Sequence, residues 1–270
     1  MELVIRPRRG WIGIDWAELY RYRELLYFLI WRDVKVRYKQ TVLGIAWAVL
    51  PPVFTMVVFT VVFGGFAQLP SEGLPYPVFT YAGLLPFTFF SNGVSQAGQS
   101  LINQQHLLTK VYFPRLFVPS SAIGSGVVDF AISFGVYACI LAIYGVTPSW
   151  GIVFMPFLVV ITILASLGLG YMLAALTVAY RDFRYVLPFL VQALMYISPV
   201  IWSVETVPSR YQWIFGLNPM TGVIDGFRSA VSGKPWNMTL ISMAVLVSAA
   251  LFAFGLFYFR KTERRFADIA

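Results

Sequence analysis

The chain has 270 residues, of which 59% are hydrophobic and only 12% are charged, and its mean hydropathy is +0.73. A water-soluble domain of this composition would lack polar surface, so an ordinary soluble protein is excluded and a lipid bilayer is indicated as the solvent. The formal net charge of +8 does not indicate a nucleic-acid-binding protein, because most basic residues flank apolar segments.

Six apolar stretches are each long enough, at about 20 residues, to cross a bilayer as a helix. The predicted fold is therefore an all-α membrane protein, with residues 42–270 as one six-span domain and residues 1–41 as a cytoplasmic segment. The expected spans are Val42–Phe66, Val78–Gln99, Phe117–Tyr144, Ile152–Val178, Val186–Val204 and Thr239–Phe259.

The distribution of basic residues predicts the orientation. All lysines and arginines except Arg210, Arg228 and Lys234 fall on the side that holds both termini. Basic residues near span ends stay in the cytoplasm, so we expect both termini to be cytoplasmic. The N-terminal residues contain no apolar stretch long enough for a signal peptide.

The N-terminal segment Asp15–Lys39 mixes leucines, aromatic residues and basic residues. This composition is typical of an amphipathic helix that lies in the headgroup layer and contacts membrane lipid. An ordinary anchor next to the membrane is the alternative interpretation.

The first expected span has an aromatic face that could line a substrate conduit. Trp47 and Phe54 stand seven residues apart, which places them on one face of a helix. Such a face suits sugar rings, although Trp47 also fits the aromatic belt at the membrane interface.

The loop Leu101–Leu116 is short, polar and on the expected cytoplasmic side. We predict a surface helix that docks on a soluble partner, with a solvated loop as the alternative. Its candidate contact residues are Gln104, His106, Lys110, Tyr112 and Arg115.

Asp129 is the only acidic residue within an expected span, and no span contains a lysine or arginine to neutralise it. We interpret it as a hydrogen-bonded structural group, with a proton-driven carrier as the functional alternative. A membrane-embedded sugar transferase is a further alternative, but it would need paired carboxylates, and none cluster in the sequence.

The fifth expected span contains two prolines, which kink helices and free backbone carbonyls. Polar and aromatic residues follow one helical stripe along it, which predicts the lining of a water-accessible conduit; helix packing is the alternative. The conduit candidates in this region are Gln192, Tyr196, Pro199, Trp202 and Ser203.

The outer segment 205–237 is too polar to span but is rich in aromatic residues such as Trp213. It predicts two short amphipathic helices that sit at the outer leaflet or re-enter it. Asn218-Pro219 should begin the second helix and Gly233 should end it. Asp225 and Arg228, three residues apart, are expected to pair.

The sequence contains no G-x-x-x-x-G-K-[ST] loop, so ATP-driven work would need another subunit that holds ATP and Mg²⁺. The single Cys139 and the single histidine give no pattern typical of a metal site. We therefore expect no metal and no cofactor in this chain, and no catalytic residues.

Several blocks, in order, resemble the permease subunits of type-2 ABC transporters that export polysaccharide. The resemblance covers most of the chain, from about Leu29 to Arg264. The blocks are Arg37–Gly44 with Trp47 and Pro51-Pro52, Leu85–Asn92 with Gln99–Ile102, Leu108–Leu116, Arg181–Phe183, Ser198–Val200, Asn218–Met220 and Asp225–Arg228.

This resemblance implies a homodimer joined to two copies of an ABC ATPase subunit in a bacterial plasma membrane. It implies export of a lipid-linked polysaccharide such as O-antigen, capsule or teichoic acid. The loop 101–116 would be the coupling helix, the segment 205–237 would frame the exit, and the first and fifth spans would line the conduit. A type-2 ABC exporter of a drug or lipid is the alternative within the same fold.

Overall fold

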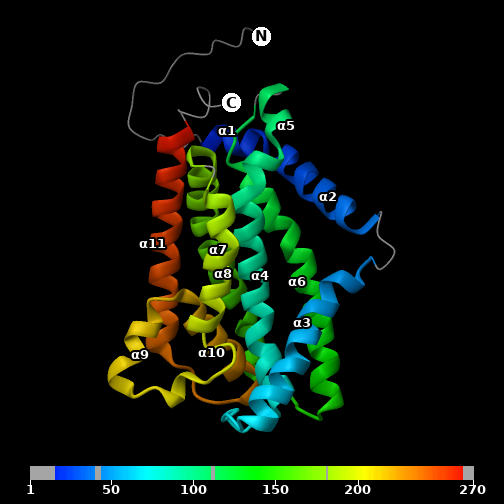
Figure 1. The fold of residues 1–270 in the computed structure, drawn as a ribbon, viewed down its shortest axis with the longest axis vertical. Coiled ribbons are helices and arrows are strands. Elements are labelled where there is room, and N and C mark those ends of the chain that lie inside the picture. Colours follow the sequence, from blue (N-terminus) through cyan, green and yellow to red (C-terminus); the bar gives the residue numbers. More distant parts are fainter. Residues whose placement is uncertain (1–15, 40–43, 111–112, 181, 264–270) are drawn as a thin grey trace.

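The computed structural model describes residues 16–39, 44–110, 113–180 and 182–263, and this part of the chain is helical, with no β-strand. Helix α1 and the last turn of α11 lie at one end of a bundle, near α5, and α9 and α10 lie at the opposite end (Figure 1). The α-helices are α1 (Trp16–Arg21), α2 (Arg23–Lys39), α3 (Ala46–Phe59), α4 (Tyr76–Asn103), α5 (Gln105–Lys110), α6 (Phe117–Ile143), α7 (Met155–Ala179), α8 (Phe183–Ile197), α9 (Ser209–Gly216), α10 (Pro219–Ser232) and α11 (Met238–Glu263). A π-helical stretch, Thr60–Phe66, extends α3, and 3₁₀ turns occupy Trp150–Phe154 and Val204–Thr206.

Helices occur at all six positions where spans are expected. Within the described residues, four helical stretches are long and apolar enough to cross a membrane: Ala46–Phe66, Phe117–Ile143, Trp150–Ala179 and Met238–Glu263. Helix α4 has 28 residues but is more polar, and α8 has only 15. At 1.5 Å per residue α8 is about 22 Å long, shorter than the hydrocarbon core of about 30 Å.

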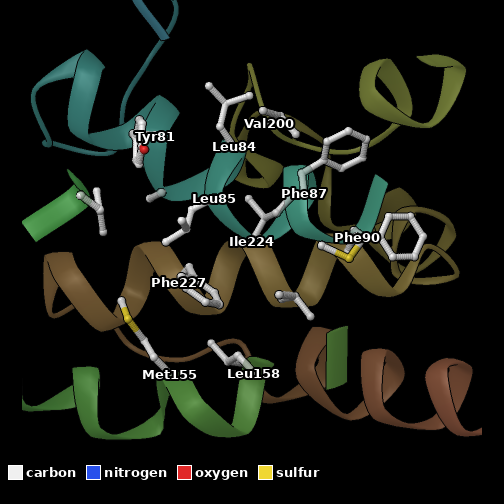
Figure 2. Packing of buried hydrophobic residues seen from close by; sticks show 14 of the residues in the cluster. Tyr81, Leu84, Leu85, Phe87, Phe90, Met155, Leu158, Val200, Ile224 and Phe227 are labelled. Atoms are coloured by element: carbon white, nitrogen blue, oxygen red, sulfur yellow. The ribbon is translucent and has the colours of Figure 1, made fainter. Parts of the chain in front are cut away.

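The main core lies where α4, α7, α10 and α11 meet. Figure 2 shows α10 between α4 and α7, with Phe227 and Ile224 of α10 beside Leu85 of α4 and above Leu158 of α7. All four of these side chains are buried. This end of the bundle is therefore held together by interdigitated apolar side chains, as in the interior of a soluble protein.

Helices α7 and α11 pack along much of their length and approach closely at a pair of glycines. A Cβ atom added to Gly255 would lie 1.9 Å from the carbonyl oxygen of Gly168. Only glycine on α11 allows this approach, and small residues are the usual means by which membrane helices gain van der Waals contact.

The N-terminal segment forms two helices rather than one, because the expected helix over 15–39 is interrupted at Tyr22 between α1 and α2. Helix α2 packs across α6: Leu29 is buried, and Ile30 lies against Gly124, where an added Cβ would approach Ile30 Cδ1 to 2.7 Å. Two aromatic residues of α2, Tyr27 and Trp31, are exposed.

Candidate functional site

An ionic cluster joins the end of α2 to α4 and α6. The guanidinium of Arg37 donates hydrogen bonds to the Asp129 carboxylate and to Gln96 Oε1, and the Tyr38 hydroxyl also donates to Asp129. Burial raises the pKa of Tyr38, against the opposing effect of Arg37, so the phenol stays protonated and able to donate.

Asp129 has a basic partner, although no span contains a lysine or arginine. This partner, Arg37, comes from the helix that precedes the first span in the sequence. Charged residues in membrane helices commonly pair with other charged residues of the protein. The signal in the sequence is the position of Arg37, in the last turn of α2 and close to the start of α3.

Two neighbouring hollows lie along the polar side of α4, one on each side of this cluster. The first is a cavity of about 240 Å³ whose lining includes Trp47, Asn92 and Ser133. The second is an open crevice of about 840 Å³ that lies nearer to α5 and reaches Asn103 and Lys110. Arg37 and Gln96 line both. Asn92, Gln96 and Asn103, three of the polar residues of α4, therefore line these hollows.

The expected coupling loop forms a separate short helix. Helix α5 follows directly after α4 and lies at the tip of the bundle (Figure 1). His106 and Lys110 are exposed on it, and Gln104 lies at the junction with α4. Arg115 donates a 3.2 Å hydrogen bond to the backbone carbonyl of Glu263, which ties the loop to the end of α11. Tyr112 lies outside the described residues.

The expected conduit stripe is wrong in its second half. Gln192 and Tyr196 are exposed on α8, but the helix ends at Ile197, so the spacing that put Pro199 and Ser203 on the same face no longer applies. Pro199 and Ser203 are buried. Ser203 donates a hydrogen bond to Glu72.

The remaining conduit candidates differ in their environments. Trp202 packs edge-on against Phe215, with the ring centroids 5.1 Å apart. Trp47 is 58% exposed and Phe54 is 70% exposed on α3. Helices α3 and α8 both pack on α4, and each presents an aromatic, largely uncovered face.

The outer-side segment begins and ends its second helix as expected. Asn218 Oδ1 accepts a 3.1 Å hydrogen bond from the backbone N–H of Met220, Pro219 opens α10, and Gly233 ends it with φ at +73°. Helix α9 is mostly exposed and carries the exposed Trp213, whereas α10 is buried on nearly all sides. Of the two expected positions, at the outer leaflet or re-entering it, the surface position does not apply to α10.

Arg228 explains how a charged residue occupies this buried helix. Its side chain is 1% exposed and donates to the backbone carbonyls of Val200 at 2.9 Å, Trp202 at 3.1 Å and Phe79 at 3.4 Å. Its guanidinium carbon lies 3.5 Å from the centroid of the Phe79 ring. In place of the expected pairing with Asp225, Arg228 is hydrogen-bonded to these carbonyls. Those of Val200 and Trp202 lie just after α8, and that of Phe79 lies in α4.

A second ionic cluster links the loops at the end of the bundle that holds α9 and α10. Lys234 Nζ lies 3.0 and 3.1 Å from the two carboxylate oxygens of Glu205 and 3.6 Å from Glu72 Oε2. Glu72 belongs to the loop between α3 and α4, so the cluster ties that loop to the segments on either side of α9 and α10.

Four long apolar helical stretches within the described residues define a multi-pass α-helical membrane protein. A sequence profile described as ABC-2 type transporter matches residues 24–231, and the chain belongs to this family of membrane transport proteins.

Named relatives cover most of the chain. It is 31% identical to the O-antigen export system permease protein RfbA of Myxococcus xanthus, over 78% of this chain and 82% of the relative. It is 27% identical to RfbA of Klebsiella pneumoniae, over 91% and 95% respectively. It is 26% identical to the polysialic acid transport protein KpsM of Escherichia coli, over 87% and 92%.

Proposed function

We propose that this chain is the membrane-spanning permease subunit of an ATP-driven exporter of lipid-linked polysaccharide in a bacterial plasma membrane. The observation that carries the proposal is the likeness, over most of their lengths, to permeases named for export of O-antigen and transport of polysialic acid. O-antigen, capsule and teichoic acid are the candidate polymers.

The proposed assembly is a homodimer with two copies of an ABC ATPase subunit, which would hold ATP and Mg²⁺. The sequence lacks a phosphate-binding loop, so the energy has to come from a partner. Helix α5 supports the assembly, because it lies at the tip of the bundle with His106 and Lys110 exposed. ATP binding by the partner would move α5, and through it the end of α4.

In the proposed topology, α3, α4, α6, α7, α8 and α11 are the six spans and both termini are cytoplasmic. The arrangement in Figure 1 supports it, because α1 and the end of α11 share one end of the bundle and α9 and α10 occupy the other. We propose that α9 and α10 form the outer-side re-entrant hairpin. Irregular backbone at membrane depth is tolerated only when it is buried against protein. The irregular backbone beside α10 meets this condition, because it is buried and its carbonyls accept hydrogen bonds from Arg228.

The conduit would run between two protomers, past the uncovered faces of α3 and α8. Trp47, Phe54 and Tyr196 would offer aromatic surfaces to the sugar rings, and Gln192 would offer hydrogen bonds. A proton-driven carrier centred on Asp129 has less support, because the carboxylate is already engaged by Arg37 and Tyr38.

The test is a mild-detergent purification of the tagged chain from native membranes, with the co-purifying proteins identified by mass spectrometry. We expect an ATPase subunit with a Walker A loop in equal amount to this chain. A homo-oligomer that still lacks an ATPase after chemical cross-linking would contradict the proposal.

A further inference from the structure

A groove of about 480 Å³ opens at the end of the bundle where α1 and α2 meet the long helices α6, α7 and α11. Its walls are mostly apolar, and among the described residues that line it Arg23 is the only charged one. The lining comprises Leu19, Tyr20, Arg23, Leu26, Leu116, Phe117, Ser120, Tyr171, Phe252 and Leu256.

The polar groups inside the groove are already satisfied. The hydroxyls of Ser120 and Tyr171 are 2.8 Å apart, and Ser120 also donates to the carbonyl of Leu116 at 2.6 Å. The groove therefore presents an apolar interior, which favours a hydrocarbon occupant over a sugar or a peptide backbone.

Arg23 is an exposed residue at the rim of the groove. Its guanidinium carbon lies 4.1 Å from the centroid of the Tyr20 ring, so the ring supports one face of the group. A guanidinium donates through N–H groups that lie in its plane, which suits an oxyanion such as a phosphate.

The groove extends along the long helices from the end of the bundle that holds α1. Leu116 and Phe117 lie at the start of α6, whereas Phe252 is 11 residues before the end of α11, about 16 Å along that helix. A phosphate at Arg23 would thus place an acyl chain beside Leu256 and Phe252.

We propose that this groove binds one anionic phospholipid from the membrane leaflet on the side of α1, with its phosphate on Arg23 and an acyl chain along α11. The bound lipid would fill the space between the N-terminal helices and the bundle. It would thereby fix α1 and the start of α2 against α6. The inference does not depend on the exported substrate.

The test uses the purified full-length chain, depleted of lipid and titrated with phosphatidylglycerol or phosphatidylethanolamine, with bound lipid counted by native mass spectrometry. We expect one site that prefers phosphatidylglycerol. Arg23→Gln should weaken phosphatidylglycerol binding about fivefold, the factor expected for one basic residue at an anionic membrane surface. Arg21→Gln is the matched control, because Arg21 is exposed on α1 and does not line the groove.

A second pair of variants tests the groove rather than the charge. Leu256→Trp should fill it and remove the site, whereas Leu246→Trp, at an exposed position on the same helix, should leave binding unchanged. Equal affinity for the two phospholipids, or equal effects of each variant and its control, would overturn the proposal. Tighter binding of undecaprenyl diphosphate than of phosphatidylglycerol would also overturn it and assign the groove to an isoprenoid carrier.

Discussion

Helices α10 and α3 show opposite relations between sequence and burial. Helix α10 contains Asp225 and Arg228, yet nearly all of its residues are buried between α4, α7 and α11. Helix α3 is far more apolar, yet only Pro52 and Met56 are buried in it. Helix α8 resembles α3, with Leu187 alone buried.

The difference follows from the solvent. In water, apolar side chains leave the surface, but in a bilayer the lipid is as apolar as the side chains, so burial against protein is not rewarded in the same way. Polar groups then gather where other protein groups or water can satisfy them. In the internal helix α10, Arg228 donates hydrogen bonds to the carbonyls of the irregular backbone after α8, so each satisfies the polar groups of the other. The uncovered α3 and α8 remain available for lipid or for a second protomer.

The largest expected effect is at Arg228. Replacing it with alanine leaves a cavity beside Phe79 and removes the donor for three backbone carbonyls. We expect Arg228→Ala to lower the free energy of unfolding by about 3–5 kcal/mol, measured by denaturation of the detergent-purified protein. The matched control is Arg210→Ala, because Arg210 is exposed on the neighbouring α9. Similar stability of the two variants would show that α10 is not held by Arg228.

An intermediate effect is expected at the Arg37–Asp129 pair, whose side chains are 29% and 22% exposed. In a double-mutant cycle of Arg37→Gln and Asp129→Asn, we expect a coupling energy of about 1–3 kcal/mol. Unfolding of the two single variants and the double variant measures it. Additive effects would refute a direct interaction.

The same variants separate the structural role of Asp129 from proton transport. Asp129→Asn should still support export of polysaccharide in cells, because the amide can retain the hydrogen bond from Tyr38. Complete loss of export, with normal amounts of folded protein in the membrane, would favour the proton-driven mechanism.

The smallest effect on stability is expected on the uncovered face of α8. Tyr196 is 59% exposed, so Tyr196→Ala should change the free energy of unfolding by no more than about 0.5 kcal/mol. If α8 lines the conduit, export of polymer should nevertheless fall severalfold, as measured by surface polysaccharide. Leu246→Ala, at an exposed position on α11, is the matched control. Unchanged export in both variants would remove Tyr196 from the conduit.

The sequence by itself determined the features that depend on local physics. Apolar length located helices at the six expected positions, and Asn218, Pro219 and Gly233 marked the ends of α10, because capping and backbone conformation involve residues a few positions apart. It also placed Gln192 and Tyr196 on one face of a helix, and this spacing applies because both residues precede the end of α8 at Ile197.

Only the tertiary structure decided which distant groups meet. Asp129 is paired by a residue 92 positions earlier, and Arg228 finds the carbonyl of Phe79 149 positions away. Periodicity contains no information on such pairings, since they arise when α2 crosses α6 and when α10 inserts beside α4. The early end of α8 was likewise undetectable from hydropathy: the turn at Ser198–Ser203 is buried, and the carbonyls of Val200 and Trp202 within it are satisfied by Arg228.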